Sequence, residues 1–340
     1  MQRCFQLAAM GLGYTAPNPI VGALLVFEDR IIGEGFHQEF GGPHAEVNCM
    51  QSVPLDLLHL VEKSTLYVSL EPCAHFGKTP PCSDLIISKK IPEVVIGCGD
   101  INEQVNGRGI EKLERAGVRV RVGILEKEAL IVNRRFFTFQ RLKRPYIILK
   151  WARSSDNKMA GADKRIFISN ALTNRLTHKW RSEEGAILVG THTAINDDPA
   201  LTSRLWKGPN PLRTVIDREL KLPQTLQLFD GKVKTMVFNQ VKQEDTGSVS
   251  YIKINDSTDL PHQVLASLYN EGINSVIIEG GATLFNSFIE PGLWDEARVI
   301  TNELLIIGNG IGAPAFNMTN PEREEYLYTD RISYYFNESH

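Results

Sequence analysis

The sequence predicts an α/β protein with two domains, and three features support this prediction. The chain has 340 residues, 42% hydrophobic and 23% charged, which is the composition of an ordinary globular protein with room for two hydrophobic cores. Apolar strand patterns alternate with helical patterns, as in sheets covered by helices. The alternation occurs twice, before and after a basic stretch. We place the boundary between Arg144 and Pro145, so the expected domains are 1–144 and 145–340.

The two series of patterns have the same organisation. In the first, apolar runs predict strands at 20–27, 31–35, 65–70, 94–98 and 118–122, and helical spacing predicts helices at 45–52, 82–90 and 107–116. In the second, the expected strands lie at 146–150, 186–189, 214–216, 235–238, 275–278 and 297–301, and the expected helices at 172–182 and 261–270. Each series is sufficient for one sheet with helices packed on it.

The charge of the chain argues against a nucleic-acid partner. The formal net charge is −3, whereas binding to a phosphate backbone needs an excess or a stripe of lysine and arginine. The dense basic run from Arg134 to Arg144 lies where we expect a solvated linker. No apolar run approaches the roughly eighteen residues that cross a membrane. We therefore expect neither a nucleic acid nor a membrane as a partner.

Cysteine usage predicts a reducing, cytoplasmic environment. Five cysteines stand at irregular spacing, with no signal peptide, so a disulfide framework is not expected. Cys4, Cys49 and Cys98 lie in apolar surroundings, and we expect them to be small buried residues. The other two, Cys73 and Cys82, are expected to be ligands.

A zinc site is predicted at His44, Cys73 and Cys82. Catalytic zinc takes three protein ligands and keeps a fourth position for water, and one imidazole with two thiolates meets that count. Pro43 is expected to open a helix with His44 in its first turn. The two cysteines flank a loop that enters the next helix, whose N-terminus lowers the pKa of a thiol, so both thiolates are expected to form readily.

Glu46 is the expected proton carrier of this site. It lies two residues past the histidine, close enough to touch a water on the metal without ligating the metal. It can take a proton from that water and deliver it to a ring nitrogen and to departing ammonia, which predicts hydrolytic deamination by a zinc hydroxide. A structural zinc site is the alternative, because such sites close with a fourth ligand and His75 is a candidate.

The loop between the two cysteines is longer than in generic zinc deaminases. Eight residues, 74–81, separate Cys73 from Cys82, where the generic motif has two. The longer loop predicts a larger substrate. Within it Lys78 offers a positive charge for a phosphate, and His75 offers a hydrogen-bond donor.

The sequence also resembles a known family. The segments 17–22 (Pro-Asn-Pro-Ile-Val-Gly), 42–48 (Gly-Pro-His-Ala-Glu-Val-Asn) and 71–82 (from Glu-Pro-Cys to Pro-Pro-Cys) resemble the bifunctional riboflavin-biosynthesis deaminase/reductase. The resemblance covers nearly the whole chain. It implies a cytidine-deaminase-like three-layer domain followed by a dihydrofolate-reductase-like α/β domain. It further implies Zn²⁺ and NADPH as cofactors, and a homo-oligomer built through the reductase domain.

The family's reactions are implied in the same way. The deaminase acts on 2,5-diamino-6-(5-phosphoribosylamino)pyrimidin-4-one, and the reductase then uses NADPH to convert the ribosyl group to ribityl. The implied substrate contacts are Asn18, His37 and Lys78 in the first domain, and Lys150, Arg181, Leu201, Arg204 and Glu279 in the second. The implied cofactor contacts are Ala152, Phe167, Thr193, Asp197, Arg218, Gly281, Ala282, Thr283, Leu284, Phe285, Asn286 and Ser287.

Part of the second domain carries a signal of its own. An apolar strand runs into Glu279-Gly280-Gly281 and then a helix, a turn that suits a phosphate at a helix N-terminus but also serves as a plain connection. Arg181 and Arg204 suit a bidentate clamp on the substrate phosphate, although a solvated salt bridge explains Arg181, taken by itself, better than binding does. Asn157 and Arg218 depart from the family pattern, which has glycine and a small residue there.

Other functions stay open at this stage. A zinc deaminase of another nucleobase, or of nucleic acid with an RNA-binding second domain, predicts a basic surface studded with aromatic residues on the C-terminal half. A zinc-stabilised nucleotide sensor without turnover predicts unfolding on chelation.

Overall fold

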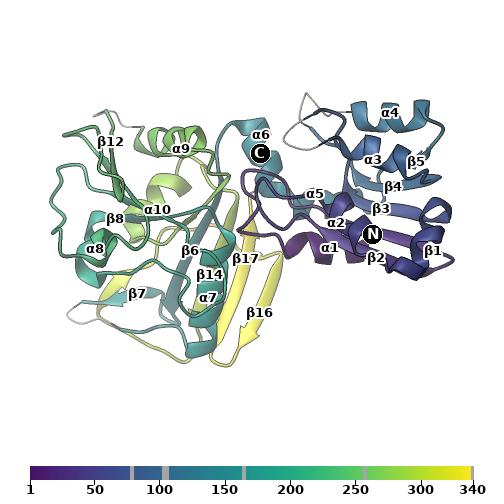
Figure 1. Cartoon of the computed structure of the whole chain (residues 1–340). Helices are drawn as coiled ribbons and strands as arrows, with labels where there is room; N and C mark the ends of the chain where they lie inside the picture. Colours follow the sequence, from purple (N-terminus) through teal and green to yellow (C-terminus); the bar gives the residue numbers. More distant parts are fainter. Residues whose placement is uncertain (77–79, 102–106, 163–165, 256–258, 338–340) are drawn as a thin grey trace. The chain divides into compact units, whose positions relative to one another are not determined.

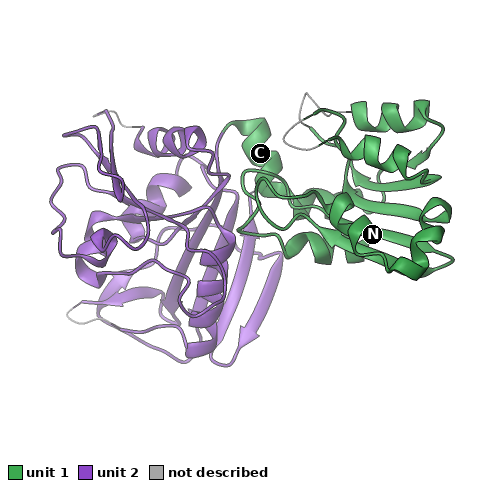
Figure 2. Cartoon of the chain, in the orientation of Figure 1, with its two compact units in different colours: residues 1–143 green, residues 144–340 purple. Residues whose placement is uncertain are grey.

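The computed structural model describes residues 1–76, 80–101, 107–162, 166–255 and 259–337. The chain forms two compact units, Met1–Lys143 and Arg144–His340 (Figure 2). Lys78, the predicted contact for the phosphoribosyl arm, lies outside the described residues. Each unit has its own sheet and its own core, and each is described by itself (Figure 1).

In the described part of the first unit, five strands form one sheet in the order β2-β1-β3-β4-β5. β1 pairs antiparallel with β2 and β3, whereas β3, β4 and β5 are parallel. The strands are β1 (Gly22–Phe27), β2 (Arg30–Phe36), β3 (Thr65–Leu70), β4 (Glu93–Cys98) and β5 (Arg119–Arg121). The helices are α1 (Gln2–Ala9), α2 (Ala45–Gln51), η1 (Leu55–Lys63), α3 (Cys82–Ser88), α4 (Arg108–Arg115), α5 (Glu126–Val132) and α6 (Arg134–Leu142).

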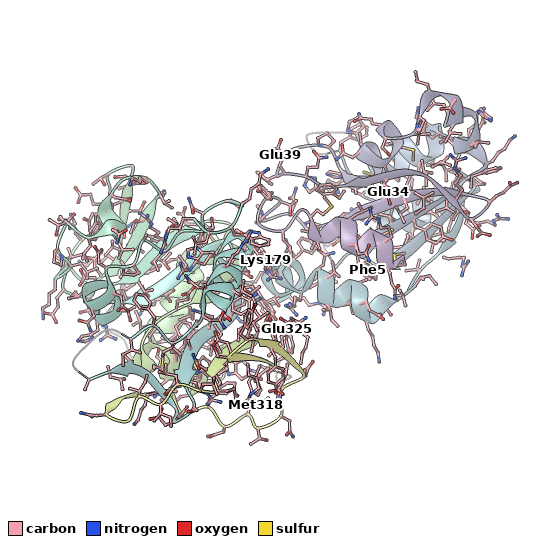
Figure 3. All side chains as sticks on the ribbon, turned by 90° about the horizontal axis from the view of Figure 1, so that it is seen from below. Phe5, Glu34, Glu39, Lys179, Met318 and Glu325 are labelled. Carbon is pink, nitrogen blue, oxygen red and sulfur yellow. The ribbon has the colours of Figure 1, made fainter. Side chains whose placement is uncertain are left out.

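Helices cover both faces of this sheet, as the alternation along β1 requires. Leu25 packs with residues of α2, α3 and α4, whereas its neighbour Leu24 packs with α1. An ion pair between Arg3 and Glu34, with nitrogen to oxygen distances of 2.8 and 3.1 Å, also joins α1 to β2. Figure 3 labels Phe5 and Glu34 on these two elements. The predicted three-layer α/β domain is confirmed.

The basic stretch is a helix, which corrects its interpretation as a linker. α6 spans Arg134–Leu142, and α1, η1 and α5 are further helices that the patterns did not predict. Phe136, Phe137 and Phe139 of α6 are buried. The density of arginine concealed this apolar face, and one of these arginines, Arg135, is itself buried beside the phenylalanines.

The predicted burial of three cysteines is confirmed. Cys4, Cys49 and Cys98 are at most 1% exposed. Burial raises the pKa of Cys4 and of Cys98 to about 12, and it raises the pKa of Cys49 as well. Thiols held neutral in this way are unreactive, so these residues serve packing.

In the described part of the second unit, ten strands form one sheet in the order β11-β12-β10-β9-β8-β13-β6-β14-β17-β16. The seven from β12 to β14 are parallel, and β11, β17 and β16 add antiparallel edges. The strands are β6 (Tyr146–Ser154), β8 (Ala186–Gly190), β9 (Leu212–Ile216), β10 (Thr235–Asn239), β11 (Glu244–Asp245), β12 (Val249–Lys253), β13 (Ser275–Ile278), β14 (Glu296–Asn302), β16 (Arg323–Leu327) and β17 (Asp330–Phe336).

Helices lie on both faces of this sheet too. Along β6, Ile147 and Leu149 pack with α9 (Leu260–Asn270) and α10 (Ala282–Ile289), and Ile148 packs with α7 (Ala171–Glu183) and α8 (Thr191–Asp197). A small ribbon of β7 (Lys158–Gly161) and β15 (Gly310–Gly312) and the 3-10 helix η2 (Gln227–Phe229) complete the unit. The parallel strands end at one edge of the sheet, the edge at which open α/β sheets bind ligands.

The start of the second unit is held by a buried ion pair. Arg144 donates two hydrogen bonds to Asp295, at 2.6 and 2.8 Å, and Asp295 also accepts from the backbone N–H of Ile147. Arg144 therefore belongs by its contacts to the second unit. No helix within the described ranges has both the length and the apolar character needed to cross a membrane.

Candidate active sites

The three predicted zinc ligands lie together in the first unit. The Nδ1 atom of His44 is 3.3 Å from the Sγ atom of Cys82 and 3.6 Å from that of Cys73. All three ligand atoms fall within 4.8 Å of one another. Zinc at about 2.3 Å from sulfur and 2.0–2.1 Å from nitrogen, with tetrahedral angles, separates such atoms by roughly 3.6 Å. The donor set and its spacing therefore fit a zinc ion.

Each ligand is placed at the end of an element. Cys73 follows β3, and Cys82 is the first residue of α3. His44 is the N-cap of α2, with extended backbone, which corrects its expected place in the first turn. The difference arises because an N-cap residue leaves the helical conformation and its carbonyl accepts the first helical hydrogen bond, here from Asn48.

The N-terminus of α3 binds Cys73 directly. The backbone N–H of Cys82 donates to the Cys73 sulfur at 3.3 Å, and the N–H of Ser83 donates to the Cys73 carbonyl at 3.1 Å. The Cys82 thiol also shares a proton with Cys73, which lowers the pKa of Cys73 to about 4 and raises that of Cys82 well above its usual value. The two sulfurs thus hold one proton between them, which zinc bound by both would displace, and the expectation that both thiolates form readily stays a prediction.

Glu46 lies beside these ligands in the first turn of α2. Its side chain is only 3% exposed, and burial, with the nearby Cys73 thiolate, raises its pKa. A carboxyl group whose pKa is raised can hold a proton and pass it on near neutral pH. The geometry is therefore that of a proton carrier next to a metal site.

A cavity of about 380 Å³ opens onto this group. Asn18 and His37, the predicted pyrimidine contacts, line it together with His44 and Glu46. The Nδ1 of His37 lies 3.0 Å from the Pro43 carbonyl, to which only an N–H can donate, so Nε2 is left to accept from the Asn18 amide at 3.3 Å. Burial lowers the pKa of His37, which keeps the ring neutral.

A structural zinc site would need a fourth protein ligand, and the described residues do not provide one. The ligand group that they form contains His44, Cys73 and Cys82. His75, the candidate for a fourth ligand, lines the cavity but is not part of that group. A fourth position open to the cavity is typical of a catalytic zinc site.

Glu71 supports the metal loop, a role that its place in the Glu-Pro-Cys segment did not reveal. Its buried carboxylate accepts four backbone N–H groups at 3.0–3.3 Å, from Asp100, Gly107, Gly109 and Ile110. A side chain at Gly109 would lie 2.0 Å from the Pro72 carbonyl, so α4 begins directly against the segment that carries Cys73. One carboxylate thus ties the metal loop to the N-terminus of α4.

We expect Glu71→Gln to weaken zinc retention. The amide replaces one acceptor oxygen by an NH₂ group that faces N–H donors, which leaves two buried donors unpaired, each at a cost of about 1–3 kcal/mol. Measured as zinc release to a colorimetric chelator, the rate should rise at least about tenfold. Glu62→Gln, which removes an exposed carboxylate of the same unit, is the control. Equal release rates for the two variants would contradict the role of Glu71.

In the second unit, Glu279 follows β13 and binds two cations. Arg181 of α7 donates to both carboxylate oxygens at 2.8 Å, and Lys150 of β6 lies at 3.4 Å. The three side chains are 10–13% exposed. Burial alone would raise the pKa of Glu279, but the charges of Arg181 and Lys150 outweigh it and hold the pKa at about 2. Burial lowers the pKa of Lys150, and Glu279 opposes that change.

This triad gives Arg181 a bidentate partner other than the predicted phosphate. A third donor of its guanidinium binds the Thr202 carbonyl at 3.2 Å. The salt bridge is buried and not solvated, since its side chains are 10–13% exposed, and it joins α7 to the residue after β13, 98 positions later in the sequence. Arg204 is exposed and close enough to Arg181 for the two charges to repel, so it retains a free face for an anion.

The predicted cofactor residues divide by exposure. Gly281 is the exposed N-cap of α10, and a side chain there would lie 3.9 Å from Thr193 Oγ1, so the turn after β13 and helix α8 meet. The side chains of Leu284 and Phe285 point into the core at 9% and 0% exposure, so a cofactor contact there would involve the backbone, and the predicted contact stays a prediction. Helical spacing explains this, since every third or fourth residue of α10 faces the sheet.

The remaining predicted contact residues differ in how exposed they are to solvent. The structure places Leu201 in the core, at 2% exposure, and Phe167 on the surface, at 80%. Other predicted contacts at the surface or partly buried are Ala152, Asp197, Arg218, Ala282, Thr283, Asn286 and Ser287. Asn157 has a φ of 61°, the left-handed conformation expected where it replaces a glycine.

The buried triad predicts an acid-sensitive second unit. A carboxylate whose pKa falls to about 2 on folding, from an ordinary value near 4.5, stabilises the fold by about 3 kcal/mol above pH 4.5. That contribution is lost as the pH falls from about 4.5 towards 2. Urea titrations monitored by tryptophan fluorescence should show this loss, because Trp151, Trp180, Trp206 and Trp294 all lie in the second unit. A Glu279→Gln protein with an equal acid slope would contradict the assignment.

The three-ligand group beside a buried glutamate is typical of a zinc deaminase. The largely parallel sheet of the second unit, with an exposed glycine turn at its ligand-binding edge, is typical of an α/β domain that binds a nucleotide, as reductases do. Residues 1–98 match the cytidine and deoxycytidylate deaminase zinc-binding region, and residues 145–322 match the RibD C-terminal domain. The chain belongs to the RibD family. It is 37% identical to riboflavin biosynthesis protein RibD of Aquifex aeolicus, over 92% of this chain and 88% of that one.

Solved structures agree over both units. A diaminohydroxyphosphoribosylaminopyrimidine deaminase/5-amino-6-(5-phosphoribosylamino)uracil reductase from Thermotoga maritima has a TM-score of 0.88 at 35% identity, covering 98% of this chain and 96% of that one. RibD of Acinetobacter baumannii has a TM-score of 0.84 at 31% identity, covering 98% and 97%. The fold of each unit, as predicted, is that of this family.

Proposed function

We propose that the chain is a bifunctional enzyme of riboflavin biosynthesis, with a hydrolytic deaminase in the first unit and an NADPH-dependent reductase in the second. The observation that carries the proposal is the three-ligand group with Glu46 beside it, opening onto a cavity of about 380 Å³. That volume lies in the range of small-molecule sites, about 300–1,000 Å³. The family match over both units extends the proposal to the reductase.

The substrate of the first unit is 2,5-diamino-6-(5-phosphoribosylamino)pyrimidin-4-one. Zinc held by His44, Cys73 and Cys82 would supply a Lewis acid that lowers the pKa of water. Glu46 takes one proton from the attacking water and passes it to the ring nitrogen, then takes the second proton from the same oxygen and passes it to the leaving amino nitrogen, so that a carbonyl remains at C2. The water oxygen bonds to C2, the bond from C2 to its amino nitrogen breaks, and ammonia leaves.

Asn18 and His37 orient the pyrimidine in this reaction. The neutral His37 ring is fixed by the Pro43 carbonyl and accepts from the Asn18 amide, so the Oδ1 atom and the second N–H of Asn18 are held in place for a ligand. Lys78 and His75, in the long loop between the cysteines, suit the phosphoribosyl arm by charge and hydrogen bonding.

The second unit reduces the ribosyl group of the deaminated product. NADPH, when bound, supplies the hydride. Gly281 and the first N–H groups of α10 suit its phosphates, because the first backbone N–H groups of a helix lack partners within it. Thr193, Asp197 and Arg218 stand at the same edge of the sheet, after β8 and β9. Lys150 and Glu279 are the polar groups that could supply a proton for the reduction. Arg204 suits the substrate phosphate.

We also infer that the enzyme is cytoplasmic and forms homo-oligomers through the second unit, with no nucleic-acid partner. The five cysteines are unpaired, which suits a reducing compartment. β16 is an edge strand with unpaired backbone groups, and Tyr326 on it is 65% exposed. Light scattering after size exclusion should give at least a dimer. A monomer would contradict the inference.

The test of the proposed function is one assay with two signals. Zinc-loaded protein is mixed with the diaminopyrimidinone substrate and NADPH, and ammonia and NADPH are followed together. We expect ammonia release first and NADPH oxidation after it. Ammonia without NADPH oxidation would overturn the reductase, and neither signal from folded protein would overturn the substrate assignment.

A further inference from the structure

Asn133 connects two distant parts of the first unit through its side chain. It stands between α5 and α6, outside the matched residues 1–98, and is 2% exposed. Its Nδ2 donates to the Ile20 carbonyl, and its Oδ1 accepts from the Ile20 N–H, both at 2.9 Å. The amide thus pairs with the backbone of Ile20 as a neighbouring strand would.

The backbone that Asn133 binds leads directly to the cavity. Ile20 ends the segment Pro17-Asn18-Pro19, in which each proline restricts the backbone. Two residues before Ile20, Asn18 turns its amide to His37, and both side chains line the cavity. A shift of Ile20 would therefore carry Asn18 with it, because the short proline-flanked segment has little freedom to absorb the change.

Asn133 is itself held in place by both helices. Its N–H donates to the Ala129 carbonyl of α5, and its carbonyl accepts from the N–H of Phe137 in α6. Phe136 and Phe139 of α6 then line the same cavity. The start of α6 thus forms one wall of the cavity, and Asn133 joins it by two hydrogen bonds to the segment 17–20, which carries Asn18.

We propose that Asn133 is a positioning residue of the deaminase site that acts through Asn18. The proposal rests on the proposed deaminase function. An amide suits this position because it offers a donor and an acceptor side by side, whereas an aspartate has no donor and would repel the Ile20 carbonyl. Removal of the amide leaves the buried N–H and carbonyl of Ile20 without partners. The segment 17–20 is expected to move, because a shift would let these groups find other partners.

The experiment compares Asn133→Asp and Asn133→Ala with wild-type enzyme. We expect KM for the diaminopyrimidinone to rise about 10–100-fold, as for a substrate contact misplaced by about 1 Å. The zinc content should stay unchanged, because the ligands belong to other elements. Val94→Ala, a core change in β4, controls for lost stability, and its KM should remain at the wild-type value. Equal KM changes in Val94→Ala and the Asn133 variants would overturn the proposal.

A double-mutant cycle separates positioning from a structural role. If Asn133 acts through Asn18, Asn133→Ala should raise KM little further in an Asn18→Ala background. Additive effects would overturn the proposal. The imidazole NMR signals of His37 should shift in Asn133→Ala and not in Val94→Ala. Failure of the proposed function is distinguishable, because wild-type protein would then release no ammonia.

Discussion

Glu46→Gln should abolish ammonia release, with a rate at least about 10³-fold below wild type. General acid–base groups contribute about 10²–10⁴-fold, and Glu46 is asked to move the proton of both the water and the leaving group. Glutamine keeps the size of the side chain and removes its ability to take a proton. Ammonia release is the measurement, at saturating substrate and with equal zinc content confirmed.

The same variant tests whether the two activities are separate. We expect NADPH oxidation on the deaminated product to be unchanged in Glu46→Gln, because the residues proposed for reduction all belong to the other unit. Glu62→Gln is the matched control, since Glu62 is an exposed acid of the same unit and does not line the cavity. Ammonia release within tenfold of wild type in Glu46→Gln would remove Glu46 from the mechanism.

Local signals in the sequence predicted the parts of the fold that depend on local chemistry. The strands 65–70 and 275–278 were predicted to the residue, because both are short runs rich in aliphatic and β-branched residues, of the kind that parallel sheets bury. The zinc ligands were predicted because the residue types that bind zinc, and their spacing, can be recognised directly in the sequence. Residues 134–142 were misread because the arginines conceal the phenylalanines that the fold buries.

Long-range pairs account for most of what the sequence could not predict. Asn133 lies 113 positions from Ile20, and nothing in either segment indicates that the two pair. Glu71 was visible only as part of a motif, since the N–H groups it binds belong to a later loop and helix. The pairing of Arg181 with Glu279 could not be predicted, because Arg181 lies on α7 and Glu279 follows β13, 98 positions later. Such contacts arise only once the sheet order is set.

Glu279→Gln should destabilise the second unit by about 3–5 kcal/mol and abolish reduction. Loss of the carboxylate leaves the Arg181 guanidinium buried without an anion, and breaking a buried ion pair costs about that much. Arginine cannot relieve the cost by losing its proton, whereas Lys150, whose pKa burial already lowers, can. The measurement is urea unfolding followed by the tryptophans, all four of which report on this unit.

Two further variants locate the cause of that loss. Glu219→Gln removes a carboxylate from an exposed pair with Lys221 in the same unit, and should change the free energy of unfolding by less than about 1 kcal/mol. Arg181→Leu combined with Glu279→Gln removes both partners, so it should recover part of the stability that Glu279→Gln loses. If the double variant regains stability but not reductase activity, the opposite charges of Arg181 and Glu279 stabilise the fold, and their polar groups are needed separately for the reaction. A double variant less stable than Glu279→Gln alone would instead show that Arg181 stabilises the unit through the Thr202 carbonyl and its packing, independently of Glu279.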